Sequence, residues 1–392
     1  MSSLAEAVTV KRARLESVDV VRGVIMIIMA LDHTRDFFGQ PGSPTNLATA
    51  SVALFFTRWI TNICAPVFFL LTGTGAWLSL RKRSKSELSR FLFTRGLWLI
   101  FLDLVLFRCL ALQFNFDYHV TIITVLWALG WAMIVLSALV HLRVSFVTAF
   151  GVVMIVTHNL LDSIKSANPI WSILHSPNLI FTSPGHTVFI SYPLIPWVGV
   201  TAVGYGLGQI YSWEPARRRA FLLRLGICLI VGFVVLRAIN IYGDPFRWGT
   251  QRTAVYTALS FLNTTKYPPS LLFLLMTLGP ALLLLRTVDS HTPTLLRPAL
   301  IIGKVPMFYY LLHFFLIHLL AVIICGARYG HIHWMFESPD IAHFPITQPP
   351  GWGFSLPLVY LLWAFVVIAM YPLCRWYAAL KQRSNNPWLS YL

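Results

Sequence analysis

The chain has 392 residues, of which 57% are hydrophobic and only 11% are charged, whereas average soluble domains carry about 25% charged residues. The mean hydropathy of +0.70 agrees with this imbalance. Such a composition leaves too little polar surface to cover soluble domains. It also excludes disorder, because a chain this apolar cannot stay solvated. The class that remains is a polytopic membrane protein.

The formal net charge is +16, from 30 Lys and Arg against 14 Asp and Glu. This excess is typical of nucleic-acid-binding proteins, but basic residues also set the orientation of membrane proteins, and no nucleic-acid partner is expected. The five cysteines lie within or at the ends of apolar runs and form no CxxC pair. They therefore indicate neither a zinc site nor a redox motif and are expected to be buried thiols.

About ten stretches of the chain are apolar enough to cross a membrane, since a spanning helix needs roughly 20 mostly apolar residues. The sequence therefore predicts an all-α fold, a polytopic bundle of transmembrane helices. The first stretch carries six ionisable residues, so it lacks the apolar centre of a cleavable signal peptide and is expected to be retained. The predicted spans are Val18–Phe38, Val52–Leu80, Phe91–Ala111, Thr121–Val140, Ser145–Leu161, Thr187–Tyr211, Phe221–Ile241, Pro268–Leu285, Ala299–Ala327 and Phe354–Tyr377.

Basic residues are unevenly distributed over the loops that join these spans. Twenty of them fall on one side, five fall on the other and five lie inside spans. The positive-inside rule places the richer side in the cytoplasm, and an even number of spans then places both termini there. We expect a cytoplasmic N-terminal tail over residues 1–17, a transmembrane domain over 18–380 and a cytoplasmic C-terminal tail over 381–392.

The first predicted span holds an unusual number of charged side chains. Each ionisable group inside a span costs about 2.5–3.5 kcal/mol, so these groups must face the protein interior or a water-filled cavity. Arg22 and His33 lie on one face of the helix, about 16 Å apart along its axis, because eleven residues make three turns. The ionisable residues of this span are Asp19, Arg22, Asp32, His33, Arg35 and Asp36.

Two interpretations of these charges are open. An ion-pair cluster that fixes this helix against its neighbours explains Asp19 and Arg22 as well as a binding role does. For His33 a functional role is favoured, because an ionisable group inside the membrane is a functional candidate and a histidine can accept a proton at neutral pH. A neighbouring carboxylate, Asp32 or Asp36, could orient its ring and stabilise its charged form.

The spacing of these residues resembles a known signature. Asp19-x-x-Arg22-Gly23, followed by His33 eleven residues after the arginine, is similar to the motif of membrane-embedded acyltransferases of the acyltransferase-3 superfamily. A longer ordered set of motifs resembles bacterial relatives of heparan-α-glucosaminide N-acetyltransferase. That set comprises Ala30–Asp36, Thr57–Ile60 leading into Ala65–Phe68, Lys266–Leu271, Met276–Pro280 and Gly303–His313.

The resemblance implies a multi-helix enzyme in a bacterial inner (cytoplasmic) membrane. Such an enzyme takes an acyl group from acyl-CoA on the cytoplasmic side and passes it to an acceptor, often a sugar, on the far side. The family histidine corresponds to His33 and the family arginine to Arg22. The loop Gly39–Ser51, toward which the animal enzyme has its catalytic histidine, contains no histidine here, which strengthens the case for His33.

The other candidate residues fall into three groups. Asp32 and Asp36 are expected to complete the catalytic group around His33. Arg22, Asp19 and Arg81 are expected to bind CoA near the inner surface, where basic side chains attract its phosphates. The residues expected to bind the acceptor are Arg35, Arg58, Asn62, Lys266 and His313.

Some of these residues have simpler explanations. Arg58 is explained equally well as a structural partner of a carboxylate in the first helix. Lys266 is better explained as an interfacial anchor, and His313 as a hydrogen-bonded histidine of the core. No metal is predicted, because the histidines of the segment 329–353 lack a recognised ligand motif.

The predicted function is the transfer of an acetyl or other acyl group from acyl-CoA to a sugar hydroxyl or amine across the membrane. Direct transfer and an acyl-histidine intermediate are both open. The expected partners are acetyl-CoA as the acyl donor, a glycan-like acceptor and the lipid bilayer, and a homodimer is left open. The alternative is a proton-coupled transporter of a small polar or glycan-related solute, which a charged first helix also suits. The lack of a visible internal repeat weighs against it.

Overall fold

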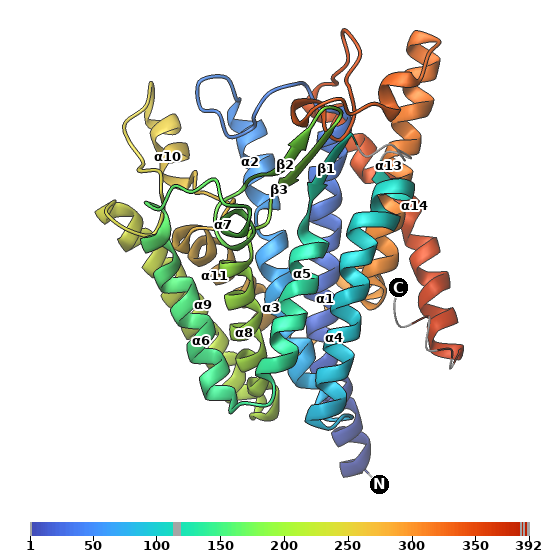
Figure 1. Cartoon of the computed structure of the whole chain (residues 1–392). Coiled ribbons are helices and arrows are strands. Elements are labelled where there is room, and N and C mark those ends of the chain that lie inside the picture. The colour runs from blue at the N-terminus through green and yellow to red at the C-terminus, as the bar shows by residue number, and fades with distance from the viewer. Residues whose placement is uncertain (1, 113–118, 385, 387–388, 390–392) are drawn as a thin grey trace.

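Helices make up most of what the computed structural model describes, which is residues 2–112, 119–384, 386 and 389 (Figure 1). The structure therefore confirms the prediction that the chain is mainly helical. The α-helices are α1 (Ser2–Phe38), α2 (Val52–Thr61), α3 (Cys64–Ser79), α4 (Lys85–Phe101), α5 (Val125–Leu139), α6 (Val144–Thr157), α7 (Pro169–Leu174), α8 (Leu194–Leu207), α9 (Pro215–Ile239), α10 (Ala254–Leu262), α11 (Leu271–Thr287), α12 (Arg297–Lys304), α13 (Pro306–Tyr329) and α14 (Leu356–Arg383).

Five helical segments of the described chain are long and apolar enough to cross a membrane. They are Val52–Ser79, which comprises α2 and α3, Val144–Leu161, which begins with α6, and helices α9, α13 and α14. Helices α5 and α11 are apolar but shorter. These helices and the composition make the chain a multi-pass membrane protein, while the total of about ten spans and the cytoplasmic termini stay predictions.

Every predicted span contains a helix, but several spans differ in detail from the prediction, and two of these differences concern helix continuity. The span expected over Ala299–Ala327 is divided into α12 and α13, because Val305 leaves the helical conformation (φ −132°, ψ 51°) before Pro306, and a proline disfavours helical geometry in the residue that precedes it. The span expected over Phe91–Ala111 continues beyond α4 as a π-helical segment, Leu102–Leu112.

Three short strands form a sheet at one end of the bundle, hereafter the sheet end (Figure 1). The prediction of an all-α fold was wrong on this point. Residues assigned to the starts of two spans pair instead as strands, because runs of β-branched and aromatic residues fit a half-buried sheet. Gly185, at φ +80°, makes the turn between the second and third strands. The strands, β1 (Val120–Ile123), β2 (Asn178–Ser183) and β3 (His186–Ile190), lie in the order β1–β3–β2, with β1 parallel and β2 antiparallel to β3.

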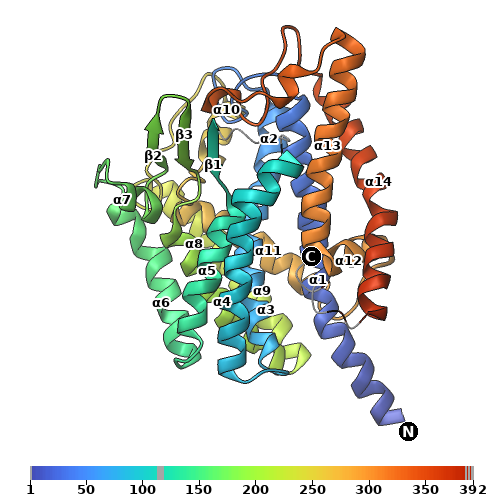
Figure 2. The ribbon, with the colours of Figure 1, turned by 45° about the vertical axis from the view of Figure 1, so that its right-hand side comes forward.

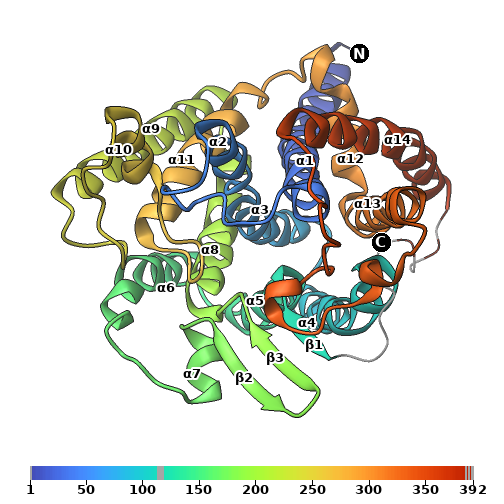
Figure 3. The ribbon, with the colours of Figure 1, turned by 90° about the horizontal axis from the view of Figure 1, so that it is seen from above.

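Helix α1 runs through the middle of the molecule. It packs against α12, α13 and α14 on one side and against α2 and α3 on another, as the view from above shows (Figure 3). Its N-terminal end projects from the bundle at the end opposite the sheet (Figure 2). The charged residues in the last turns of α1 are therefore enclosed by other helices near the sheet end.

Two glycines bring the backbones of α1 and α12 into direct contact. A Cβ atom on Gly23 would lie 1.7 Å from the carbonyl oxygen of Ala299, and one on Gly303 would lie 1.8 Å from that of Asp19. Close crossings of this kind between helices in membranes depend on small residues. The crossing fixes the lower half of α1 against the start of the α12–α13 pair.

We expect Gly23→Ala to lower the free energy of unfolding by at least about 1–3 kcal/mol, because the added methyl group overlaps a backbone atom that cannot move away freely. Thermal unfolding of the purified protein in detergent measures the loss. Gly75→Ala in α3 is the matched control, since a Cβ there meets nothing within 4 Å and alanine favours helices. Equal melting temperatures for the two variants would show that the crossing tolerates a methyl group.

Candidate active site

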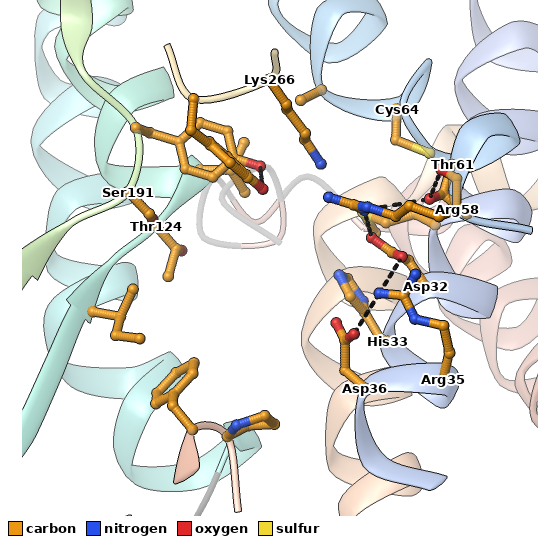
Figure 4. A pocket seen from close by; sticks show the side chains of 18 of the residues that line it. Asp32, His33, Arg35, Asp36, Arg58, Thr61, Cys64, Thr124, Ser191 and Lys266 are labelled. Atoms are coloured by element: carbon orange, nitrogen blue, oxygen red, sulfur yellow. Dashed lines mark hydrogen bonds and ion pairs between the residues drawn. The ribbon is translucent and has the colours of Figure 1, made fainter. Parts of the chain in front are cut away.

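The last turns of α1 carry a cluster of charged side chains that meets Arg58 of α2 (Figure 4). Nη2 of Arg35 lies 2.9 Å from Oδ1 of Asp32 and 2.6 Å from Oδ1 of Asp36. The other carboxylate oxygen of Asp32 pairs with Nη1 of Arg58. Asp32 and the two arginines are only 11–13% exposed, so Asp32 is shared between two largely buried guanidinium groups, and Asp36 supplies the second negative charge. The Asp–Arg pair that was one of two explanations for Arg58 is therefore present.

Two histidines meet between α1 and α13. Nδ1 of His33 lies 2.7 Å from Nε2 of His313. Nδ1 of His313 lies 2.8 Å from the carbonyl oxygen of Tyr309, and a ring nitrogen must carry a proton to bond to a carbonyl. Nε2 of a neutral His313 is then the acceptor, so Nδ1 of His33 donates to it. The hydrogen-bond network thus assigns an unprotonated Nε2 to neutral His33.

Both rings are held firmly in place. The His33 and His313 rings stack with centroids 5.0 Å apart and planes 21° apart. The ring of Phe314 lies 3.9 Å from that of His33, centroid to centroid. His313 itself is fully buried, which agrees with the expectation of a hydrogen-bonded core histidine, although the partner of its Nε2 is the predicted catalytic residue.

A cavity of about 590 Å³ lies beside the charged cluster, a size that suits a small ligand or the end of an extended one. Its described lining excludes Asn62, which is buried where α2 ends. It also excludes His313, whose Nε2 contacts His33 of the cavity wall. The predicted site residues that line the cavity are Asp32, His33, Arg35, Asp36, Arg58 and Lys266.

The opposite wall of the cavity comes from the sheet and was not predicted (Figure 4). Thr124 follows β1, and Ser191 and Tyr192 follow β3. The hydroxyl oxygens of Tyr192 and Tyr267 lie 3.4 Å apart. Because parallel strands end at the same edge of a sheet, these polar residues come together there. In the sequence, Thr124 and Ser191 are marked only by their position directly after a run rich in β-branched residues.

A second cavity, of about 680 Å³, adjoins the first at the sheet end. Arg35, Asp36 and Phe344 line both cavities. The rest of its wall comes from loop residues near Gly42 and near Pro345 and from the first turns of α2 and α14. The charged cluster therefore stands between two cavities rather than at the end of one.

The residues expected to bind CoA lie far from this cluster, toward the other end of α1. Nη1 of Arg22 lies 2.6 Å from Oδ1 of Asp19 and donates to the carbonyl oxygen of Gly303 at 3.2 Å. Nη2 of Arg81 donates to the carbonyl oxygen of Tyr211 at 3.0 Å. Eleven residues of helix separate Arg22 from His33, which corresponds to about 16 Å.

These features define a class of protein: a multi-pass membrane protein with a charged cavity and a hydrogen-bonded histidine pair inside its helical bundle. A family model described as the catalytic domain of heparan-alpha-glucosaminide N-acetyltransferase matches residues 14–238. The match covers more than half of the chain, so the protein belongs to this family. The resemblance to heparan-α-glucosaminide N-acetyltransferase seen in the sequence is thereby confirmed, whereas the bacterial source and the wider superfamily stay expectations. The sequence matches no curated protein.

Family membership identifies a transferase, with an N-acetyltransferase-like function in a membrane. The alternative expectation of a transporter has no support. The matched segment contains His33 and Arg58, whereas Lys266 and His313 lie beyond its end. The structure brings these later residues to the same place as the matched ones.

Proposed function

We propose that this protein transfers an acetyl group from acetyl-CoA on the cytoplasmic side to a sugar hydroxyl or amine on the opposite side. The single observation that carries the proposal is His33, whose unprotonated Nε2 belongs to a residue lining a charged cavity. This histidine lies within the segment that matches an acetyltransferase family. The uneven distribution of basic residues supports the direction of transfer.

Nε2 of His33 accepts the proton of the acceptor hydroxyl or amine. The charge that develops on the ring is shared with His313, because Nδ1 of His33 already donates to Nε2 of that residue at 2.7 Å. His313 is in turn held by the carbonyl of Tyr309. We therefore assign the orienting role to His313 as a positioning residue, rather than to Asp32 or Asp36.

The charged cluster supplies the electrostatic part of the reaction. Asp32 is engaged by Arg35 and Arg58, so it holds both arginines in position at the cavity wall. Lys266 extends from the cavity wall toward Arg58 (Figure 4). Cationic donors fixed in a water-poor site stabilise the negative charge that develops on the carbonyl oxygen during acyl transfer.

The acceptor binds from the sheet end. The second cavity adjoins the charged cluster there, and the wall of the first cavity offers the hydroxyl groups of Thr124, Ser191, Tyr192 and Tyr267. Hydroxyl groups of this kind suit the many donors and acceptors of a sugar. The predicted acceptor residues Arg35, Arg58 and Lys266 lie on the same cavity.

The donor binds from the opposite end of α1. Lys304, Lys381 and Glu16 lie close enough to Asp19 to interact with it electrostatically, so three cations, Arg22 and the two lysines, stand against two carboxylates. Such an excess of positive charge fits the phosphates of CoA, and apolar side chains such as Phe68 and Phe107 on the cavity wall fit its uncharged arm. Acetyl-CoA supplies the activated thioester carbonyl.

The proton and the bonds balance within this arrangement. The acceptor oxygen or nitrogen bonds to the acetyl carbonyl carbon, and the bond from that carbon to the CoA sulfur breaks. Nε2 of His33 then returns the proton to the departing thiolate. His33 ends the cycle neutral, with the same hydrogen bond to His313.

The proposal is tested with membranes that contain the protein, labelled acetyl-CoA and a panel of glucosamine-type and hydroxyl acceptors. Transfer of label to at least one sugar is expected. Acetyl-CoA should also raise the melting temperature of the purified protein, since a ligand that binds only the folded state stabilises it, whereas free nucleotides should not. The proposal would be overturned if no label reached any sugar and millimolar acetyl-CoA produced no thermal shift.

Replacing His313 tests its positioning role. We expect His313→Ala to lower kcat about 10- to 100-fold with KM nearly unchanged, because a buried donor on His33 loses its partner at a cost of about 1–3 kcal/mol. His313→Gln should restore much of the rate, since a side-chain oxygen can accept the same bond. A change in the pH profile of kcat accompanies the Ala variant only if His313 acts through His33. Equal rates for the Ala and Gln variants would refute the assignment.

A further inference from the structure

A second cluster of ionisable groups lies away from the cavity beside His33. A turn of 3-10 helix, His158–Leu161, extends α6 at the sheet end, and α7 lies above it (Figure 2). One potential metal ligand atom from each of His158, Asp162 and His175 lies within 4.8 Å of the other two. His158 and His175 are 1% and 2% exposed. Two imidazoles and a carboxylate therefore converge at the boundary of the helical bundle.

The observation that points to a ligand is the state of His158. Neither of its ring nitrogens makes a hydrogen bond of standard geometry, although both are shielded from solvent and the backbone of Pro269 lies close to the ring. A buried polar group without a partner costs about 1–3 kcal/mol, and each such group in a native structure calls for an explanation, of which a bound ion is one. One ring nitrogen of His158 belongs to the group of atoms that converges with Asp162 and His175.

We propose that His158, Asp162 and His175 bind a divalent transition-metal ion, for which Zn²⁺ is the best match. Imidazole nitrogen and carboxylate oxygen are both zinc ligands, and three protein ligands leave a fourth tetrahedral position for water. Hard cations such as Mg²⁺ and Ca²⁺ prefer sites made of oxygen alone. Two imidazole ligands therefore favour a transition metal that binds nitrogen over Mg²⁺ and Ca²⁺.

The geometry requires only a local adjustment. Metal–ligand bonds of about 2.0 Å place tetrahedral ligand atoms about 3.3 Å apart, and Nε2 of His175 lies 3.6 Å from Oδ1 of Asp162. The same Nε2 lies 2.9 Å from the carbonyl oxygen of His158. Binding through this nitrogen exchanges that hydrogen bond for the metal. The ring of His158 gives up only a poorly aligned contact with the backbone of Pro269 when it turns toward the ion.

The carboxylate of the cluster is already held in place. Nδ2 of Asn159 donates to Oδ2 of Asp162 at 2.7 Å, and Oδ1 of Asn159 accepts from the backbone amide of Leu271 at 2.9 Å. Residues such as Asn159, which hydrogen-bond a metal ligand without binding the metal, orient that ligand in metal sites. Oδ1 of Asp162 is the oxygen that faces His175.

The proposed ion acts structurally rather than in the transfer reaction. None of its three ligands is among the described residues that line the cavity beside His33. Pro177, two residues after His175, does line that cavity. The ion therefore ties the end of α6 to the segment that leads from α7 into β2, and so steadies one part of the cavity wall.

The experiment uses the full-length protein, purified in detergent with an affinity tag that contains no histidine and stripped with a chelator. Titration with Co²⁺ should produce the visible absorption bands of a tetrahedral complex at one ion per chain, and Zn²⁺ should abolish them by competition. Zn²⁺ should also raise the melting temperature of the stripped protein. The wild-type readouts do not depend on any variant folding.

His175→Ala and Asp162→Asn should each lose the Co²⁺ bands and the Zn²⁺-dependent thermal shift. His291→Ala is the matched control, because His291 is exposed in the loop between α11 and α12, and it should keep both. Absence of the Co²⁺ bands in the wild-type protein would overturn the proposal, as would bands of equal strength in all three variants. Neither result depends on acetyl transfer, so failure here is distinct from failure of the proposed function.

Discussion

Replacing His33 with alanine is expected to lower kcat for acetyl transfer by about 10²- to 10⁴-fold, the range in which positioned general bases act. The variant removes the only group of the proposed mechanism that takes the proton of the acceptor. The KM for acetyl-CoA should change little, since the basic residues proposed to bind the donor lie near Arg22, about 16 Å away. Transfer of label from acetyl-CoA to the best sugar of the acceptor panel measures both constants.

The loss at position 33 must be separated from a loss of folding. The melting temperature of His33→Ala reports on folding, and His141→Ala, at an exposed histidine in the loop after α5, should transfer at the wild-type rate. Added imidazole should partly restore the His33→Ala rate, because the substitution leaves space beside Phe314 for a small base. A folded His33→Ala variant with full activity would refute the assignment of His33 as the general base.

The helical bundle could be predicted because its signal is local. A single apolar segment that crosses the lipid core forms a helix, since no water is present there to bond its backbone. The same reasoning singled out the last turns of α1, where Asp32, His33 and Arg35 break the apolar pattern. The ion pair between Asp32 and Arg35 follows from a spacing of three residues on a helix, which is visible in the sequence.

The parts that escaped prediction depend on contacts between distant segments. His33 and His313 are 280 residues apart, and nothing in either local sequence specifies the hydrogen bond that assigns the tautomer of His33. The strand β1 was hidden at the start of an apolar run, because its pairing with β3 is set by residues more than 60 positions later. The polar residue Thr124 at the end of β1 was missed for the same reason.

Removing Asp32 is expected to have the largest effect on stability. Asp32→Ala leaves Arg35 with Asp36 alone and leaves Arg58 without its carboxylate. Because Asp32 and the two arginines are only 11–13% exposed, we expect a loss of about 3–5 kcal/mol in the free energy of unfolding, the cost of an unpaired buried charge. Thermal and chemical unfolding in detergent measure the loss.

The decisive comparison adds a second substitution. Asp32→Ala combined with Arg58→Met removes both partners of one pair, so the double variant should be more stable than Asp32→Ala alone, while Arg35 keeps its contact with Asp36. Activity should not return with stability, since the double variant has lost a cation of the cavity wall. Asp340→Ala, which breaks a pair that is about half exposed, should leave the melting temperature nearly unchanged. If the double variant were less stable than Asp32→Ala, the cost would come from lost packing rather than from an unpaired charge.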